Sequence, residues 1–125
     1  MMVEWQVNPE HTLYAVFLTL DSDKDLVIGA KGMCHFPKGH YVYIGSAKKN
    51  IESRVQRHYK IDKTKRWHLD YLRPACTITK IQSYEHREGE CSLAAAFAQE
   101  GQIWIKQFGS SDCKCGGHLI HLFDK

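Results

Sequence analysis

A run of tyrosines followed by a basic stretch holds the residue types that could do chemistry in this chain. Tyr41 and Tyr43 alternate with branched apolar residues before the run reaches Gly45, and Arg54 and His58 follow, four positions apart. A guanidinium can bind a phosphate through paired hydrogen bonds, and phenol and imidazole groups can transfer protons. These residue types at this spacing therefore indicate a site for a phosphate group.

A strand and a helix must position these residues. The alternation over 41–44 predicts a strand, and Gly45 allows a sharp turn or the close approach of another group. Asn50 is expected to cap the following helix, its side-chain oxygen accepting from an amide of the first turn. The helix should bury a narrow apolar face made by residues spaced by four: Ile51, Val55 and Tyr59. Arg54 and His58 lie just beside this face, at the edge of the core.

The same stretch resembles the second signature of the GIY-YIG nuclease superfamily. In that signature a Tyr-Ile/Val-Gly strand precedes a helix that carries an arginine and, often, a histidine one turn later. The tripeptide Tyr-Ile-Gly at 43–45, Arg54 and His58 match it in order and spacing. Thr-Leu-Tyr at 12–14 stands where the first signature, Gly-Ile-Tyr, is expected, so Tyr14 is kept and the glycine is not.

The rest of the chain supplies further elements. The sequence predicts a short added strand over 26–30, a second short helix over 67–73 that Pro74 ends, a strand over 78–84 and a helix over 88–98. A chain of 125 residues can bury one core, so a single domain over 1–125 is expected. The resemblance implies an α/β fold with a central three-stranded, mostly antiparallel sheet, plus the added strand, flanked by helices.

Three more segments narrow the resemblance to the small stand-alone branch of Uri-type endonucleases: 66–72, 90–94 and 108–119. The similarity then covers nearly the whole chain. In the superfamily a glutamate on the helix after the third strand binds one metal ion, Mg²⁺ or Mn²⁺. Glu90 is the first choice for this ligand and Glu88 the second. Acidic residues there also suit the positive end of a helix dipole.

The resemblance implies hydrolysis of a phosphodiester by an activated water. Arg54 would neutralise charge on the phosphoryl oxygens, Tyr14 would activate the water, and Tyr43 would position the water or the phosphate. His58 could act as the base instead, or hydrogen-bond a phosphate. A phenol with its ordinary pKa near ~10 is a poor base, so a nearby cation must favour its phenolate. Taken alone, Tyr43 could equally be a packing or structural residue.

The charge of the chain is uneven. Its formal net charge is +3, yet residues 48–66 contain eight basic residues against two acidic ones, so this stretch carries +6 and the remainder −3. Such a basic patch suits a phosphodiester substrate, although a solvated helix face is the other interpretation. The substrate-binding candidates are Lys48, Lys49, Arg57, Arg66 and His68. His68, and Asp70 two residues later, could instead serve helix packing.

Five cysteines without a secretion signal argue against a disulfide framework. Cys113, Cys115 and His118 resemble part of a structural zinc site, but Cys-x-Cys is not the usual knuckle spacing. A loop with small buried thiols is therefore the preferred interpretation, and a zinc-binding interaction module is a third, weaker function. No apolar segment approaches the ~20 residues that cross a bilayer, so no membrane association and a cytoplasmic location are expected.

These observations predict a divalent-metal-dependent endonuclease that acts on DNA. The alternative is a catalytically inactive nucleic-acid-binding or regulatory domain on the same fold. The sequence leaves open whether the substrate is duplex, flap, branched or damaged DNA, or RNA. It also leaves open a protein partner or a homodimer.

Overall fold

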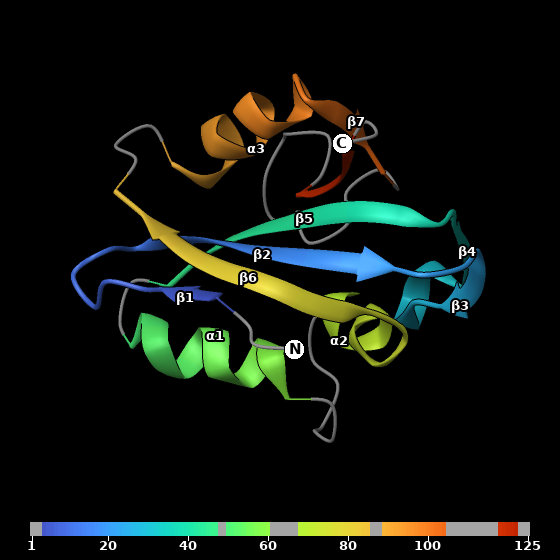
Figure 1. Cartoon of the computed structure of the whole chain (residues 1–125), viewed down its shortest axis with the longest axis horizontal. Coiled ribbons are helices and arrows are strands. Elements are labelled where there is room, and N and C mark those ends of the chain that lie inside the picture. The colour runs from blue at the N-terminus through green and yellow to red at the C-terminus, as the bar shows by residue number, and fades with distance from the viewer. Residues whose placement is uncertain (1–3, 48–49, 61–67, 86–88, 105–117, 123–125) are drawn as a thin grey trace.

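The computed structural model describes residues 4–47, 50–60, 68–85, 89–104 and 118–122. Within these ranges the elements follow in this order (Figure 1): β1 Glu4–Gln6, β2 Leu13–Leu20, β3 Lys24–Val27, β4 Met33–Phe36, β5 Gly39–Ser46, α1 Ile51–Tyr59, α2 His68–Leu72, β6 Thr77–Tyr84, α3 Glu90–Ala98, β7 Gly101–Ile103 and β8 Leu119–Leu122. Short 3₁₀ turns occupy Gly29–Lys31 and Arg73–Ala75. No helix in the described ranges has the length and apolar character to cross a membrane.

The predicted α/β fold with a mostly antiparallel sheet between helices is confirmed. The sheet has the strand order β1-β6-β2-β5-β8-β7, and β1–β6 is its one parallel pair among the described strands. Its centre consists of the three expected strands β2, β5 and β6. The sheet is wider than expected because β1, β8 and β7 extend its edges. These edge strands have three or four residues each, too few for alternation to identify them.

The expected added strand over 26–30 was wrong in its bounds and its place. The chain is extended over Lys24–Val27, and this β3 pairs with β4 in a separate two-stranded sheet. Residues 29–31 turn into the 3₁₀ helix instead of continuing the strand. The physical reason is backbone conformation, because Gly29 and Gly32 have φ values of 50° and 75°, which extended strands do not use.

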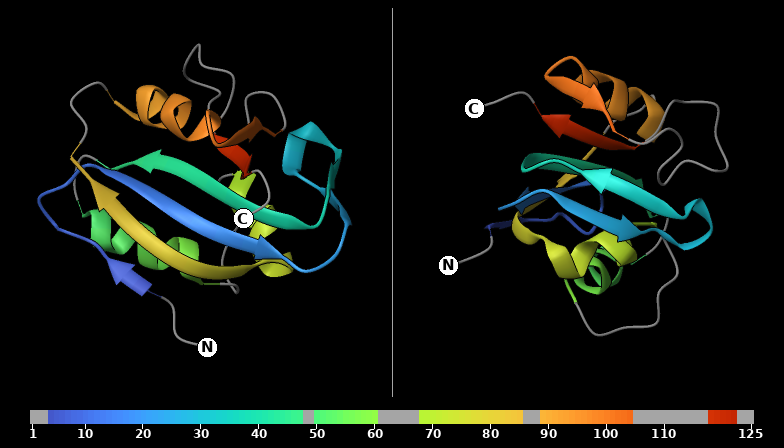
Figure 2. Two further views of the ribbon diagram at one scale, coloured as in Figure 1. Left: turned by 45° about the horizontal axis from the view of Figure 1, so that its top comes forward. Right: turned by 90° about the vertical axis from the view of Figure 1, so that its right-hand side faces the viewer.

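Two layers of helix enclose the sheet (Figure 2). Helices α1 and α2 cover one face and α3 covers the other. We call these the α1 face and the α3 face. Because side chains alternate along a strand, β2 and β5 contribute to both. The α1 face contains Tyr14, Val16, Leu18, Tyr41 and Tyr43 beneath Ile51, Val55, Leu69 and Leu72. The α3 face contains Leu13, Ala15, Val42, Ile44 and Ile120 beneath Leu93 and Ala94.

Helix α1 begins at Ile51 as predicted, but two details differ. Asn50 adopts a left-handed conformation with φ 56° and makes no side-chain capping bond to the helix. Tyr59 is 39% exposed, and His58, 1% exposed, takes the expected buried place. Residues spaced by four drift about 40° around a helix, so a third member of the series leaves the stripe while His58 stays closer to its centre.

The later elements agree with the predictions more closely. The helix expected over 67–73 is α2, and Pro74 lies in the 3₁₀ turn that ends it. The strand expected over 78–84 is β6, one residue longer at its start. The helix expected over 88–98 is α3, which begins at Glu90.

Candidate functional site

Tyr14 lies on the central strand β2, with Gly45 of β5 and Ser83 of β6 opposite it. Its side chain is 2% exposed. A Cβ atom added to Gly45 would lie 2.3 Å from the Tyr14 Oη and 2.4 Å from its Cζ. Real Cβ atoms do not approach other atoms so closely, so the phenol ring rests directly on the glycine backbone. The expectation that Gly45 permits a close approach is confirmed.

A hydrogen bond joins the Tyr14 hydroxyl to the His58 imidazole. The Tyr14 Oη lies 2.7 Å from the His58 Nε2, and which of the two donates depends on the histidine tautomer. The Tyr43 ring meets the same imidazole edge-on, with centroids 5.7 Å apart. Both partners of the hydrogen bond are almost completely buried, where an unsatisfied polar group would be costly. The predicted residues Tyr14, Tyr43 and His58 therefore come together.

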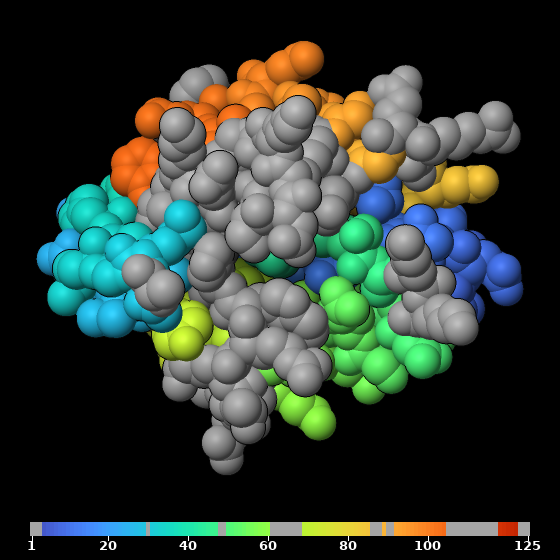
Figure 3. Space-filling view, turned by 180° about the vertical axis from the view of Figure 1, so that it is seen from behind, coloured from blue at the N-terminus to red at the C-terminus, as the bar shows by residue number. Residues whose placement is uncertain are grey.

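Arg54 lies one helical turn before His58 on α1. Its Nη1 donates to the carbonyl oxygen of Ser46, the last residue of β5, over 3.1 Å. The side chain is half-buried, so it is more accessible than the Tyr14–His58 pair. Seen from behind, the green surface of α1 adjoins the blue surface of N-terminal residues (Figure 3). Arg54 thus places a cation where β5 ends and α1 begins.

Arg57, predicted to bind substrate, forms an ion pair that links α1 to α2. Its Nη1 donates to both carboxylate oxygens of Asp70, over 3.1 and 3.0 Å. The Asp70 side chain is 0% exposed and that of Arg57 is 25% exposed. A buried carboxylate requires such a partner. The suggested packing role of Asp70 is confirmed, and Arg57 holds the helix that carries Arg54 and His58.

Two further residues beside Tyr14, Ser83 and His11, were not predicted from the sequence. Ser83 lies opposite Tyr14, is 5% exposed, and its Oγ accepts from the Asn8 amide over 2.7 Å. The same Oγ lies 2.8 Å from the Nδ1 of His11. These contacts fix the turn between β1 and β2 beside the tyrosine. No motif marks them, because they depend on the β2–β6 register.

Glu90 is the first residue of α3, and its side chain is outside the described residues. Strands β5 and β6 both end opposite Leu13, so α1 and α3 start from the same end of the sheet but cover opposite faces. Within the described residues, no three His, Cys, Asp or Glu side chains are grouped as metal ligands.

Several other candidates also fall outside the description. His68 begins α2, with its side chain beyond the described residues. The remaining predicted residues there are Lys48, Lys49, Arg66, Glu88, Cys113 and Cys115. His118, the third suggested zinc ligand, is 1% exposed, and its carbonyl oxygen accepts from the Ile44 amide over 2.9 Å.

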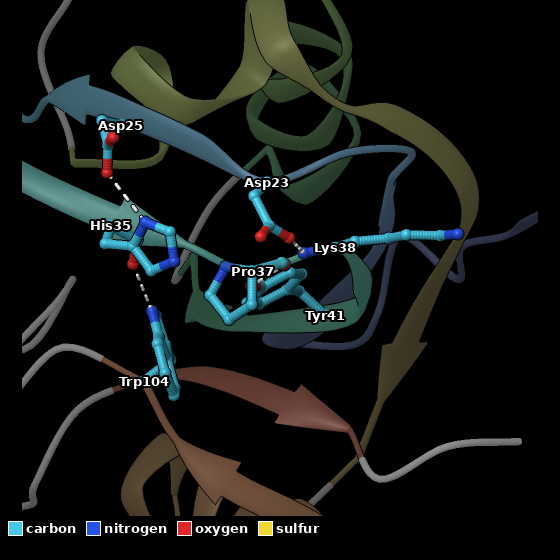
Figure 4. A network of polar contacts seen from close by, with 7 residues as sticks. All are labelled: Asp23, Asp25, His35, Pro37, Lys38, Tyr41 and Trp104. Carbon is cyan, nitrogen blue, oxygen red and sulfur yellow. Dashed lines mark hydrogen bonds and ion pairs between the residues drawn. The ribbon is translucent and has the colours of Figure 1, made fainter.

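The start of β5, at the opposite end of the sheet, has a structural network. Figure 4 shows its members: Asp23, Asp25, His35, Pro37, Lys38, Tyr41 and Trp104. The Tyr41 hydroxyl donates to the carbonyl oxygen of Pro37, and burial raises the pKa of this phenol. The Trp104 Nε1 donates to the His35 carbonyl oxygen over 2.8 Å. Tyr41 is therefore a neutral structural phenol.

A hollow of about 880 Å³ lies beside this network and away from the tyrosine–histidine pair. Its lining includes Lys38, His40, Gln102 and His121. Burial lowers the pKa of His121 from its ordinary 6.5, with a smaller contribution from His40. The hollow contains none of the predicted catalytic residues. We therefore place the candidate site at Tyr14, where the phenol and the His58 imidazole form their hydrogen bond.

Comparison with known proteins identifies the family. No curated protein and no solved structure matches the chain. A family model described as "Domain of unknown function DUF123" matches residues 13–125, from the first residue of β2 onward. The chain belongs to the DUF123 family.

Proposed function

We propose that this protein is a divalent-metal-dependent endonuclease that hydrolyses phosphodiester bonds in DNA in the cytoplasm. The buried hydrogen bond between Tyr14 and His58, with Arg54 one turn away, is the observation that carries the proposal. Gly45 is also required beneath the phenol for this arrangement. Packing alone does not require a phenol, an imidazole and a guanidinium at one strand end.

The Tyr14–His58 pair is suited to proton transfer. When the His58 Nε2 accepts the hydrogen bond, it can take the phenol proton over 2.7 Å and leave a phenolate. The phenolate then takes a proton from water, and the resulting hydroxide attacks phosphorus. The bond to the leaving oxygen breaks, and that oxygen takes up a proton. We assign Tyr14 to activation of the water and His58 to holding the proton.

Arg54 is assigned to the phosphate. It is more exposed than the buried pair, and a guanidinium can bind phosphoryl oxygens through two parallel hydrogen bonds. Its bond to the Ser46 carbonyl oxygen fixes its position before substrate arrives. A preorganised cation of this kind stabilises charge that grows on the phosphoryl oxygens. Tyr43, which contacts the same imidazole, would orient the water or the phosphate.

A bound Mg²⁺ or Mn²⁺ would supply Lewis-acid stabilisation of the phosphate and the leaving oxygen. Among the described residues, the side chains around Tyr14 are phenols, an imidazole and a guanidinium, which are not the hard carboxylate ligands that Mg²⁺ prefers. The carboxylate must then come from outside this set, and Glu90 is our choice. Mg²⁺ commonly uses one or two protein carboxylates and completes its shell with water and substrate phosphate.

The test is cleavage of plasmid, single-stranded, flap and branched DNA with Mg²⁺ or Mn²⁺. We expect Tyr14→Phe and Arg54→Ala to reduce the rate by about 10²-fold or more, as removal of a proton-transfer or charge-stabilising group does. Glu90→Gln should abolish metal-dependent cleavage. Tyr41→Phe is the matched control, since it removes a buried phenol from the neighbouring strand on the same face of the sheet but leaves the pair intact.

Two outcomes would remove the proposal. Equal loss of cleavage in Tyr41→Phe and Tyr14→Phe would indicate an unfolding effect, not chemistry. Salt-sensitive DNA binding without cleavage by the wild-type chain would favour an inactive nucleic-acid-binding domain.

A further inference from the structure

Two aromatic side chains stand in contact on the surface beside α1. Trp5 is 44% exposed and Tyr59 39% exposed, and their ring centroids are 5.7 Å apart. Figures 1 and 2 show the strand that carries Trp5 lying along α1. Large aromatics normally bury most of their surface, so two exposed ones in contact indicate a place where something stacks.

Both rings are held in place. The Arg73 Nε donates to the Tyr59 carbonyl oxygen over 2.9 Å, and its guanidinium carbon lies 5.3 Å from the Tyr59 ring centroid. Arg73 itself is 6% exposed and also donates to the Cys76 carbonyl oxygen. Trp5 is fixed by the parallel pairing of β1, in which it lies opposite Ile81. A rigid aromatic surface loses little freedom when a ligand stacks on it.

A hollow of about 260 Å³ adjoins Trp5, between β1 and α1. Its lining combines the indole with two apolar side chains, Val7 and Val55, and two polar ones, Glu52 and Gln56. Glu52 and Gln56 are exposed and four residues apart, so they lie on one side of the helix. A flat ligand in the hollow would meet a ring, an apolar floor, and hydrogen-bonding groups.

We propose that this hollow binds one unpaired base of a nucleic-acid strand, stacked on Trp5, with a preference for bases that carry an exocyclic amino group. Glu52 accepts a hydrogen bond from the amino group of cytosine or adenine, and Gln56 pairs with the base edge. Thymine offers only its N3–H donor, flanked by two carbonyl oxygens that repel the Glu52 carboxylate, so thymine fits the site less well. Stacking is tolerant of base type, so the preference comes from the two polar residues.

The base site deepens the proposed function and rests on it only in taking a nucleic-acid strand as the ligand. Arg54 and Tyr59 lie on the same helix, five residues apart, which corresponds to about 7.5 Å along its axis. The two residues are also about 140° apart around the helix, so a strand that reaches Arg54 with its phosphate and Trp5 with a base must run across α1. The sequence after Tyr59 is also basic, with Lys60, Lys63, Lys65 and Arg66. The substrate class is DNA with unpaired bases next to the cleaved bond.

Binding of oligo-dC, oligo-dA and oligo-dT to the whole chain, without divalent metal, tests the base site. Tryptophan fluorescence should be quenched, and Trp5→Leu should remove most of the quenching and weaken binding about 10-fold or more. Trp5→Phe, which keeps a stacking ring, should weaken binding less. Trp104→Phe is the control, because that indole is bonded to His35 at the other end of the sheet.

Glu52→Ala tests the preference separately. The wild-type chain should bind oligo-dC and oligo-dA at least about 5-fold more tightly than oligo-dT, in line with one base contact. In Glu52→Ala this ratio should fall to near one while stacking is kept. Thermal melting of every variant checks that the chain is folded.

The failures of the two proposals can be told apart. The base site would be overturned if the wild-type chain bound the three oligonucleotides equally and the Trp5→Leu chain bound them as tightly as the wild type. This holds whatever the cleavage assay shows. Cleavage without base-dependent quenching would leave the nuclease proposal intact. Quenching and the Glu52 effect without cleavage would leave the base site and remove the nuclease.

Discussion

The two faces of the central sheet differ in what they bury. The α1 face contains the Tyr14–His58 hydrogen bond and the Arg57–Asp70 ion pair. On the α3 face, the buried residues that the described parts of β2, β5 and α3 contribute are all apolar, Leu13, Ala15, Val42, Ile44, Leu93 and Ala94, whereas His118, 1% exposed, lies opposite Ile44. The same two strands, β2 and β5, supply both faces. Whether these strands bury polar side chains therefore depends on the helices that cover each face.

Because of this difference, we expect the two faces to contribute differently to stability and to activity. An apolar layer gains stability from burial without directional requirements. Buried polar groups are stable only when each has its partner, so the α1 face depends on exact geometry. We therefore expect substitutions of the buried apolar residues on the α3 face to change the free energy of unfolding alone. Substitutions on the α1 face should change both stability and activity.

The largest effect should come from Arg57→Leu. It removes the guanidinium that binds both oxygens of the buried Asp70 carboxylate, and we expect a loss of about 3–5 kcal/mol in the free energy of unfolding. Urea denaturation measures this. Arg57→Lys, which keeps the charge but not the paired hydrogen bonds, should lose less. A loss below about 1 kcal/mol for Arg57→Leu would contradict a strict pairing requirement on this face.

Leu93→Ala is the corresponding test of the α3 face. Leu93 is 6% exposed, and truncation should cost about 2–4 kcal/mol through lost burial and a residual cavity. Cleavage and oligonucleotide binding, measured at a temperature where the variant is folded, should match the wild type. A folded Leu93→Ala chain with impaired activity would show that the α3 face also shapes the site.

Gly45→Ala should have an intermediate effect on stability and a specific effect on the site. The new methyl group would meet the Tyr14 ring at 2.3–2.8 Å, so the ring or the strand must move, at a cost of about 1–3 kcal/mol. Cleavage should fall as well. The double variant Gly45→Ala with Tyr14→Leu should recover stability but not activity. Absence of this recovery would mean that the clash is relieved elsewhere.

The smallest effect should be a pH dependence from His121, which stacks on Tyr41 with centroids 4.5 Å apart. Burial, chiefly, lowers its pKa below the ordinary 6.5, so the unfolded chain binds its proton more readily. Stability should fall as the pH decreases below 6.5 and be unaffected by this group above it. Solvent screening keeps the change below about 1 kcal/mol. His121→Gln should flatten this part of the stability profile; an unchanged slope would contradict the assignment.

Local patterns predicted the elements that form the centre of the molecule. Alternation identified β5 and β6, and four-residue spacing placed α1, because these elements are eight or nine residues long. The edge strand β1 has three residues and depends on β6 for its structure. The Asn50 cap failed for another reason: Asn adopts the left-handed backbone more readily than most residues, and in that conformation its side chain makes no capping bond here.

Part of the candidate site could likewise be predicted from the sequence and part could not. The family resemblance grouped Tyr14, Tyr43, Arg54 and His58, and in the structure the two tyrosines meet His58 while Arg54 lies one helical turn before it. The sequence did not show that Arg57 would bind Asp70, because that contact depends on how α2 docks. The exposed Trp5 was missed for a related reason, since its strand has too little sequence pattern to be recognised.

The parallel pairing of β1 with β6 also bears on the order in which the elements can fold during synthesis. Glu4 lies opposite Lys80, seventy-six positions later in the chain. Contacts between such distant residues close a long loop, so they form late in folding. The β2–β5 hairpin and α1 can assemble while β6 is still being synthesised. A growing chain can therefore form the tyrosine–histidine pair before β6, the partner strand of Trp5, is available.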